Sequence, residues 1–440
     1  MSDEAGTRDR DGGWPSPVLA WWTIVVFFAV AVISYSDRLV LSLLVDPIRA
    51  DLRLGDTQIA LVQGLAFALI YSVAGLPFGR LADLFPRRIV IIAGVAIWSL
   101  CTIACGYAGS FAALFALRIG VGIGEAAFAP AAVSMIADLF PPNRRGIAIG
   151  CLLTGMAVGS GAAVVIGGGL LEYANAGHFA ALPVLRSLAP WRTVLVVLGL
   201  AGALPLALLL TVREPRRRET GRGGEALTVA ATFAGFRLRA AILLPLYLAV
   251  ALVSAGDFAI QNWMPALLTR RFHFTPGEIA GSLGIVSMLA GGAGTIAGGL
   301  LSDLQAGRRG DKGRLTVALS AAGIGFFGGA VAIASSGGQA IAFFALWIFM
   351  SSISGTVGIT VLQNVVPNQM RGVGTAMVSF CNVIIGLAAG TALTGALTDY
   401  VFRDPVAVGF SMTAVAMTAG GIAFLLLLRA RAAISPPRAA

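Results

Sequence analysis

The 440-residue sequence contains one lysine, Lys312, two histidines and four cysteines, and only 12% of its residues are charged. No Gly-x-x-x-x-Gly-Lys phosphate loop exists, which excludes ATP hydrolysis by a loop of that kind within this chain. His178 and His273 fall in predicted loops without clustered acidic or cysteine ligands, so we expect neither a metal site nor a cofactor. The cysteines lie within predicted helices, which disfavours a disulfide framework.

The scarcity of charge indicates a membrane protein. Hydrophobic residues make up 57% of the chain, and the mean hydropathy is +0.87, whereas soluble domains carry about 25% charged residues. Apolar runs recur that are long enough to cross a hydrocarbon core of about 30 Å, and they do not alternate as barrel strands do. The sequence predicts an all-α membrane protein with transmembrane helices at 18–46, 57–82, 88–107, 111–138, 144–172, 190–212, 240–269, 276–304, 313–335, 339–366, 370–400 and 406–430.

An internal repeat divides these twelve helices into two halves. An offset of 220 residues superimposes Asp37 on Asp257, and Gly79-x-x-x-Asp83 on Gly299-x-x-x-Asp303. A repeat of this length makes each copy a subdomain, so we expect two pseudo-symmetric six-helix bundles. The predicted organisation is a tail at 1–17, a first bundle at 18–212, a linker at 213–239, a second bundle at 240–430 and a tail at 431–440.

The distribution of the 31 basic residues predicts the orientation. Most of them fall in loops on the side of the two termini, which the positive-inside rule assigns to the cytoplasm. We expect a monomer in the plasma membrane, or the inner membrane if the chain is bacterial. Topology also explains the net charge of +10, so no nucleic-acid partner is needed. The expected partners are the substrate, protons and membrane lipids.

A charged loop provides the first family resemblance. Gly79-x-x-x-Asp83-x-x-x-Arg87-Arg88, between the second and third predicted helices, resembles the loop signature of the major facilitator superfamily. A second pair of loops, Pro142-Asn143-Arg144-Arg145-Gly146 and 367–372, repeats in the two halves. The resemblance implies the fold of that superfamily and a gating role for these loops. The gating residues that we expect are Gly79, Asp83, Arg87, Arg88, Arg144, Arg145 and Asp303.

Two further segments narrow the resemblance. Ser34-Tyr35-Ser36-Asp37-Arg38 in the first helix, and Arg118-x-Gly120-x-Gly122-x-Gly124-Glu125 in the fourth, resemble the spinster-like transporters. That group exports sphingosine phosphates and lysophospholipids. In the fifth helix Ser160 replaces the proline of the superfamily's antiporter motif, so the direction of coupling stays open.

Four charged residues lie inside the predicted helices of the first half. An ionisable group at the centre of a bilayer costs at least about 2.5 to 3.5 kcal/mol, so Asp37, Arg38, Arg118 and Glu125 should pair and face a cavity. Two interpretations stay open. In one, Arg118 with Arg38 receives an anionic headgroup while Asp37 or Glu125 exchanges a proton. In the other, the four residues form a salt-bridge network that only holds helices together.

The second half offers fewer candidates. Asp257, the repeat counterpart of Asp37, is a third candidate for proton coupling. Polar and aromatic side chains could contact the substrate, the aromatic ones along an acyl chain. The expected substrate-binding residues, the two arginines included, are Arg38, Arg118, Phe67, Tyr71, Asn262, Trp263 and Asn382.

The sequence thus predicts a secondary transporter that works by alternating access. The expected substrate is an amphipathic anion such as a lysophospholipid or a sphingoid phosphate, and the expected coupling ion is the proton. One alternative is a proton-coupled transporter of small organic anions, sugar acids or drugs. Another is a passive lipid channel or scramblase. An enzyme is disfavoured because no histidine lies in the predicted membrane helices.

Overall fold

The computed structural model describes residues 14–217, 235–366 and 370–434, and these residues form helices and loops without a strand. Parts of the predicted tails and linker, and the beginning of the loop at 367–372, lie outside the described residues. The all-α prediction is confirmed. Local sequence signals explain where several helices begin. Ser16 and Ser110 accept hydrogen bonds from backbone N–H groups of the first turns of their helices, and Pro17 follows Ser16, which is the usual chemistry of a helix start.

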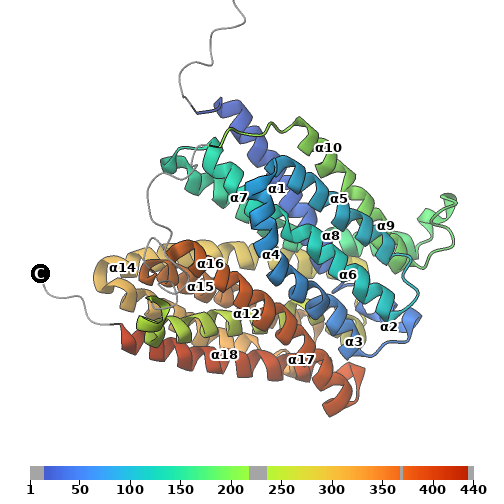
Figure 1. Ribbon diagram of the computed structural model, residues 1–440. Helices are drawn as coiled ribbons and strands as arrows, with labels where there is room; N and C mark the ends of the chain where they lie inside the picture. The colour runs from blue at the N-terminus through green and yellow to red at the C-terminus, as the bar shows by residue number, and fades with distance from the viewer. Residues whose placement is uncertain (1–13, 218–234, 367–369, 435–440) are drawn as a thin grey trace, which may run out of the picture.

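The first half of the chain forms one bundle (Figure 1). Its helices are α1 (Pro17–Val40), α2 (Val45–Leu52), α3 (Asp56–Ala60), the π-helical η1 (Leu61–Leu65), α4 (Ala66–Leu84), α5 (Arg87–Cys105), α6 (Phe111–Ala126), α7 (Phe128–Leu139), α8 (Pro142–Asn175), the short η2 (His178–Ala181), α9 (Pro190–Ala201) and α10 (Ala203–Thr211). Several predicted membrane helices are therefore divided: the second runs through α3, η1 and α4, the fourth through α6 and α7, and the sixth through α9 and α10.

The second half forms the other bundle. Its helices are α12 (Ala240–Phe272), α13 (Pro276–Ile279), the π-helical η3 (Ala280–Gly284), α14 (Ile285–Gly328), η4 (Val331–Ile333), α15 (Gly337–Val365), α16 (Arg371–Cys381), the π-helical η6 (Asn382–Ala389), α17 (Gly390–Ala396), η7 (Leu397–Phe402), η8 (Pro405–Ala407) and α18 (Val408–Ala433). The repeat is visible in the backbone, since η1 and η3 interrupt corresponding helices and the 220-residue offset places Gly64 on Gly284.

Eleven segments of the described residues are long and apolar enough to cross a membrane, where the sequence predicts twelve. The difference arises at 276–304 and 313–335, which the structure joins into one span, Pro276–Ile333. Within α14, Gly310 has a left-handed φ of 57°, so the two predicted helices meet at a kink rather than at a loop. Glycine adopts this conformation at little cost because it has no Cβ atom.

The two bundles lie against each other with their helix ends on two common sides. We call one of these sides the terminal side; it carries the beginnings of α1, α5 and α12 and the ends of α4, α7 and α10. We call the opposite side the far side; it carries the ends of α1, α8 and α12. Figure 1 shows that α3 of the first bundle meets α17 of the second on the far side. The candidate site lies between the bundles, where α1 and α4 face α16.

Candidate functional site

Close contact between α1 and α8 positions the first wall of the site. Gly159 of α8 lies so near α1 that a Cβ atom there would be 2.6 Å from the carbonyl oxygen of Val32 and 2.8 Å from the Cβ of Tyr35. The hydroxyl of Ser36 donates to the carbonyl of Gly159 at 3.1 Å. Small residues allow such close packing of membrane helices. The contact fixes the turn of α1 that carries Tyr35 and Arg38.

The glycines before Glu125 position that residue in the same way. A Cβ atom on Gly122 would lie 3.1 Å from the carbonyl oxygen of Phe67 in α4, and one on Gly124 would lie 2.6 Å from the carbonyl oxygen of Gly94 in α5. The alternating glycines of α6 therefore allow two neighbouring helices to approach it. The result is that Glu125 sits, 3% exposed, beside α1.

Arg38 and Glu125 form a buried ion pair. Arg38 donates to Oε2 of Glu125 from Nη2 at 2.5 Å and from Nε at 3.2 Å. Three aromatic rings surround the guanidinium carbon, with centroids at 4.6 Å for Tyr35, 4.2 Å for Phe67 and 5.1 Å for Tyr71. Cation–π attraction strengthens when the cation is desolvated, as it is here. Arg38 thus occupies an aromatic cage closed by one carboxylate.

Asp37 and Arg118 form a second buried pair next to the first. Nη1 of Arg118 lies 3.8 Å from Oδ2 of Asp37, and the hydroxyl of Thr102 donates to the same oxygen at 2.8 Å. The Arg118 side chain is 1% exposed, and the Asp37 side chain 3%. The structure therefore brings together all four charged residues that the sequence singled out, as two pairs on α1 and α6.

Both pairs leave polar atoms without partners among the described residues. These atoms are Oε1 of Glu125, Oδ1 of Asp37, and Nε and Nη2 of Arg118. A buried charged group that lacks a hydrogen-bond partner is costly, and salt-bridge networks built only for stability satisfy such atoms. The two carboxylate oxygens can accept a hydrogen bond from a water molecule or a substrate atom, and the two Arg118 nitrogens can donate one.

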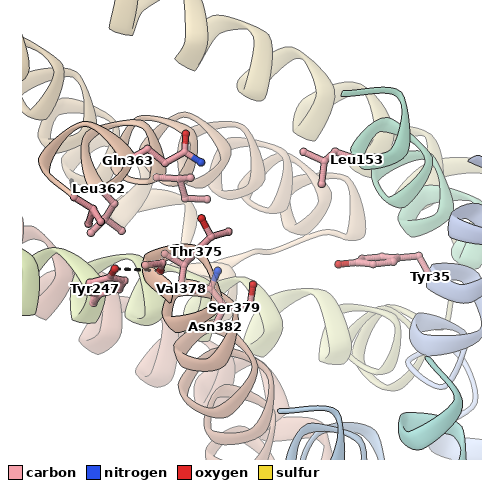
Figure 2. A pocket seen from close by; sticks show the side chains of 12 residues that line it. Tyr35, Leu153, Tyr247, Leu362, Gln363, Thr375, Val378, Ser379 and Asn382 are labelled. Atoms are coloured by element: carbon pink, nitrogen blue, oxygen red, sulfur yellow. Dashed lines mark hydrogen bonds between the residues drawn. The ribbon is translucent and has the colours of Figure 1, made fainter. Parts of the chain in front are cut away.

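A cavity of about 420 Å³ lies between Tyr35 and the second bundle. Figure 2 shows the Tyr35 hydroxyl pointing into it, with Ser379 and Asn382 among the side chains beyond. Tyr247 also lines the cavity and donates to the carbonyl of Gly374 at 3.1 Å. The cavity is lined by Tyr35, Leu153, Tyr247, Ile359, Leu362, Gln363, Val366, Gly374, Thr375, Val378, Ser379 and Asn382. We call it the polar cavity.

A second cavity, of about 460 Å³, also borders α16 and is mainly apolar. It begins at Tyr71 of the Arg38 cage and passes between α7 and α16. It is lined by Tyr71, Ser72, Gly75, Ala126, Ala129, Pro130, Val133, Thr375, Ala376, Ser379 and Phe380. We call it the apolar cavity. Thr375 and Ser379 of α16 line both cavities.

The predicted substrate residues are distributed unevenly around these cavities. Tyr71 and Asn382 line them, whereas Arg38 and Phe67 stand behind Tyr35 and Tyr71 as members of the cage. Arg118 is absent from the described residues that line either cavity. It lies deeper in the first bundle, where it pairs with Asp37.

Asn262 and Trp263 also lie away from the cavities and join α12 to α17 within the second bundle. The amide of Asn262 donates to the hydroxyl of Thr391 at 2.9 Å, and the indole of Trp263 donates to the Thr391 carbonyl at 3.2 Å. Asp257 accepts a hydrogen bond from the indole of Trp347 at 2.8 Å. Its repeat counterpart Asp37 lies 3.8 Å from Arg118, whereas Asp257 forms no ion pair with an arginine among the described residues.

Among the predicted gating residues, Arg87 is the one most fully buried. Its guanidinium pairs with Asp138 of α7, and its Nε donates to Glu214, just after α10, at 2.8 Å. The other carboxylate oxygen of Glu214 accepts from the backbone N–H of Arg88 at 2.8 Å. Arg217 donates to the carbonyls of Ala82, Asp83 and Phe85 at the end of α4. The beginning of the predicted linker is thus bound to the loop between α4 and α5.

The remaining gating candidates lie at the terminal surface. Asp83 is exposed, and a Cβ atom on Gly79 would meet nothing within 4 Å. Nε of Arg145 donates to the carbonyl of Phe140 at 3.0 Å, and Arg144 is exposed. Asp303 is 81% exposed and lies 3.8 Å from Arg314. These residues contact their own bundle in this conformation.

The structure adds a charged cluster on the far side that sequence reasoning missed. Arg270, near the end of α12, donates to Asp46 at 2.8 Å and to both oxygens of Asp56, at 2.7 and 2.8 Å. The Asp56 side chain is completely buried. These partners are more than 200 residues apart in the chain, and no local motif marks them. The described residues contain no group of three or more His, Cys, Asp or Glu that could hold a metal ion.

Known proteins resemble this chain over most of its length. Residues 26–391 match the family model of the Major Facilitator Superfamily. An MFS-type efflux pump of Mycolicibacterium smegmatis is 28% identical over 405 residues, which cover 90% of this chain and 87% of that protein. A hexuronate transporter of Bacillus subtilis is 26% identical, covering 86% of this chain and 87% of that protein.

The spinster proteins are also similar. Protein spinster of Drosophila melanogaster is 27% identical over 293 residues, which cover 64% of this chain and 46% of that longer protein. A bacterial homologue of the human lysosomal transporter spinster, solved in an inward-facing and unoccupied conformation, matches with a TM-score of 0.78 and 25% identity. That match covers 95% of this chain and 96% of the solved one.

Proposed function

The chain belongs to the Major Facilitator Superfamily and is a membrane transporter, and on this basis we propose that it is a secondary, proton-coupled transporter of an amphipathic anion. The substrate class is that of lysophospholipids and sphingoid phosphates. Arg38 is the group that receives the anionic head. In keeping with the distribution of basic residues, we place the terminal side in the cytoplasm and the protein in the plasma membrane, or the inner membrane of a bacterium.

The observation that carries this proposal is the Arg38 cage. Its guanidinium, already desolvated, lies against the rings of Tyr35, which lines the polar cavity, and Tyr71, which lines the apolar cavity. A phosphate or carboxylate matches the fork of guanidinium donors. If Tyr35 or Tyr71 turns aside, a headgroup can take the place of Glu125 as the partner of Arg38. Arg118, which is deeper and bound to Asp37, then acts through Asp37 rather than on the substrate.

The two cavities support an amphipathic substrate. Each lies within the range of about 300 to 1,000 Å³ that is typical of small-molecule sites. The polar cavity supplies hydroxyl and amide groups from Gln363, Thr375, Ser379 and Asn382, and the apolar cavity supplies a mainly hydrocarbon lining. A single-chain lipid could place its head near Arg38 and its tail in the apolar cavity.

Proton coupling follows from competition for Arg38. When a headgroup displaces Glu125, the released carboxylate stays in a buried site without its arginine partner, and an uncompensated buried charge is costly. A proton taken up at Glu125 therefore accompanies substrate binding. Asp37 offers a second position of the same kind, and Asp257 a third in the other bundle. A proton bound together with the substrate gives symport, whereas antiport would require the proton to bind only when the substrate has left.

The test is a thermal-shift and direct-binding screen of the purified protein against lysophosphatidic acid, sphingosine phosphate and glucuronate at two pH values. We expect the two lipids to bind, and Arg38→Met/Glu125→Gln to lose that binding while the unliganded protein still folds. Dissipation of an imposed proton gradient should reduce uptake into proteoliposomes. Unsaturable flux that ignores the gradient would identify a passive lipid channel or scramblase instead.

A small hydroxylated anion is the second candidate. It is favoured by the amide and hydroxyl groups of the polar cavity and by the similarity to a hexuronate transporter along most of both chains. Arg38 would bind the carboxylate, and the apolar cavity would stay empty. Stabilisation by glucuronate alone would select this function, and stabilisation by bulky hydrophobic drugs alone would select drug efflux, which the similarity to an efflux pump suggests.

A further inference from the structure

On the far side the two bundles meet along two seams that correspond in the repeat. In the first, the segment from α3 through η1 packs against α17 and η6. In the second, α13 and η3 pack against α8. Each seam joins the beginning of one interrupted helix to a helix of the other bundle. We call them the α3/α17 seam and the α13/α8 seam.

Matching glycines permit both crossings. A Cβ atom on Gly395 of α17 would lie 2.6 Å from the carbonyl oxygen of Asp56, and a Cβ atom on Gly168 of α8 would lie 2.6 Å from the carbonyl oxygen of Pro276. Pro276 is the residue that the 220-residue offset pairs with Asp56. The two crossings are therefore pseudo-symmetric copies of one contact.

A carboxylate caps the helix beginning in each seam. Asp399, in η7 after α17, accepts hydrogen bonds from the backbone N–H groups of Asp56 at 3.1 Å and Thr57 at 2.7 Å. Glu172, near the end of α8, accepts one from the backbone N–H of Gly277 at 3.1 Å. Gly277 corresponds to Thr57 at the same offset. Each carboxylate caps a helix of the other bundle, and a negative charge near the beginning of a helix stabilises that helix.

The two seams differ in strength. In the α3/α17 seam, Arg270 adds bonds from the second bundle to Asp46 and to the buried carboxylate of Asp56. The α13/α8 seam lacks this addition, because proline replaces the aspartate at Pro276. Glu172 is exposed to solvent, whereas Asp399 is half-buried. Water competes with the Glu172 contact more effectively than with the buried pair.

We propose that these seams are two unequal latches of a far-side gate, and that the α13/α8 seam parts before the α3/α17 seam when the gate opens. The inference rests on the secondary transport proposed above, working by the alternating access that the sequence predicts. Asp399, Glu172, Asp56 and Arg270 act as positioning residues: they hold the bundles in the closed arrangement and do not contact the substrate.

The experiment measures spin-label distances across each seam in proteoliposomes, in a background without the four native cysteines. One label pair, Asn175→Cys and Gly281→Cys, spans the α13/α8 seam; a Cβ atom on Gly281 would meet nothing within 4 Å. The other pair, Arg53→Cys and Val401→Cys, spans the α3/α17 seam. Under a proton gradient we expect the first pair to show a larger population at long distance than the second.

Two substitutions weaken the latches separately. Because Asp399 holds two backbone N–H groups in a partly buried site, Asp399→Ala should raise the long-distance population of the second pair about tenfold or more. Glu172→Ala should raise that of the first pair only about two- to fivefold. Controls are Asp404→Asn and Glu278→Gln, which remove carboxylates that cap backbone N–H groups within their own bundle. Neither control should shift either population.

The outcomes are distinguishable. If the second pair separates first, or both always separate together, the inference of unequal latches is wrong, while uptake measured in the same vesicles can still support the transport function. If neither pair separates while gradient-driven uptake proceeds, far-side opening along these seams is wrong. Should Asp399→Ala fail to fold, Arg270→Gln provides the same test of the α3/α17 latch.

Discussion

Arg38 donates two hydrogen bonds to the same carboxylate oxygen of Glu125, at 2.5 and 3.2 Å, and the other oxygen has no partner among the described residues. This pair concentrates charge on one oxygen of a site that is otherwise aromatic. A bidentate pair would satisfy both oxygens. The one-sided geometry leaves the second oxygen of Glu125 open to a further hydrogen-bond partner.

Removing one partner of this pair should destabilise the protein more than removing both. Glu125→Gln leaves the buried Arg38 charge uncompensated, and breaking a buried pair typically costs about 3 to 5 kcal/mol. Arg38→Met should cost a similar amount. In the double variant Arg38→Met/Glu125→Gln we expect partial recovery, with a coupling energy of roughly 0.5 to 3 kcal/mol. Unfolding in a mild detergent, followed by tryptophan fluorescence, measures all three.

Transport separates this structural effect from a functional one. The double variant should fold but fail to bind lysophosphatidic acid or to take it up, because the receiving cation is gone. Arg80→Met, a change at an exposed arginine outside the site, is the control and should leave both stability and uptake unchanged. Full uptake by the double variant would show that the pair only holds helices together.

The glycines of α6 should be sensitive to a single added methyl group. Gly124→Ala would place a Cβ atom 2.6 Å from both the carbonyl oxygen of Gly94 and the backbone nitrogen of Trp98. Since backbone atoms cannot move aside easily, we expect a loss of about 1 to 3 kcal/mol in stability. The displacement of Glu125 from Arg38 should also reduce uptake.

The matched control is Gly150→Ala in α8, where a Cβ atom would meet nothing within 4 Å. Alanine stabilises a helix interior by roughly 0.5 to 1 kcal/mol relative to glycine, so this variant should be neutral or slightly more stable. Equal stability of the two variants in the same unfolding assay would contradict the close crossing of α5 and α6.

The sequence predicted the architecture well because apolar length, the 220-residue repeat and the charged loop signature are local signals or depend on a fixed offset. The four charged residues on α1 and α6 were found because an ionisable group inside a predicted membrane helix is costly and therefore rare. The kink at Gly310 was missed because two apolar runs separated by charged residues normally indicate a loop. The π-helical segments were missed because they leave the hydrophobic pattern unchanged.

The orientation of individual side chains could not be predicted from the sequence. Asn262 and Trp263 looked like candidate pathway residues, yet both bond to Thr391 of α17, because the helix rotation depends on the neighbouring helix. Contacts between bundles were equally hidden: Arg270 lies 214 residues from Asp56 in the chain. Tyr35, which lines the polar cavity and covers Arg38, was quoted only as part of a motif, although a tyrosine three residues before a membrane arginine shares its helix face.

A substitution at Asp257 that keeps its hydrogen bond to Trp347 should separate an effect on folding from an effect on proton coupling in the second bundle. Asp257→Asn keeps an oxygen that can accept from the indole, so the variant should fold. If Asp257 exchanges a proton, the variant should lose gradient-driven accumulation while it retains exchange of labelled for unlabelled substrate, which needs no net proton movement. The comparison of the two assays in the same vesicles measures coupling directly. Gradient-driven accumulation by the variant at the wild-type level would show that Asp257 does not take part in proton coupling.

The apolar cavity should discriminate between substrates with and without an acyl chain. Val133, on its α7 wall, is 44% exposed and lines the cavity. Val133→Trp would fill much of that space, and we expect it to weaken binding of lysophosphatidic acid at least about tenfold, equivalent to 1.4 kcal/mol. Glycerol phosphate, which has the same head without the tail, should bind the variant and the wild type alike if it binds at all.

The control is Ile324→Trp, which adds the same bulk in a separate groove on α14. Isothermal titration of both ligands against the three proteins decides the matter: equal weakening by both tryptophans, or none by either, would place the acyl chain outside the apolar cavity.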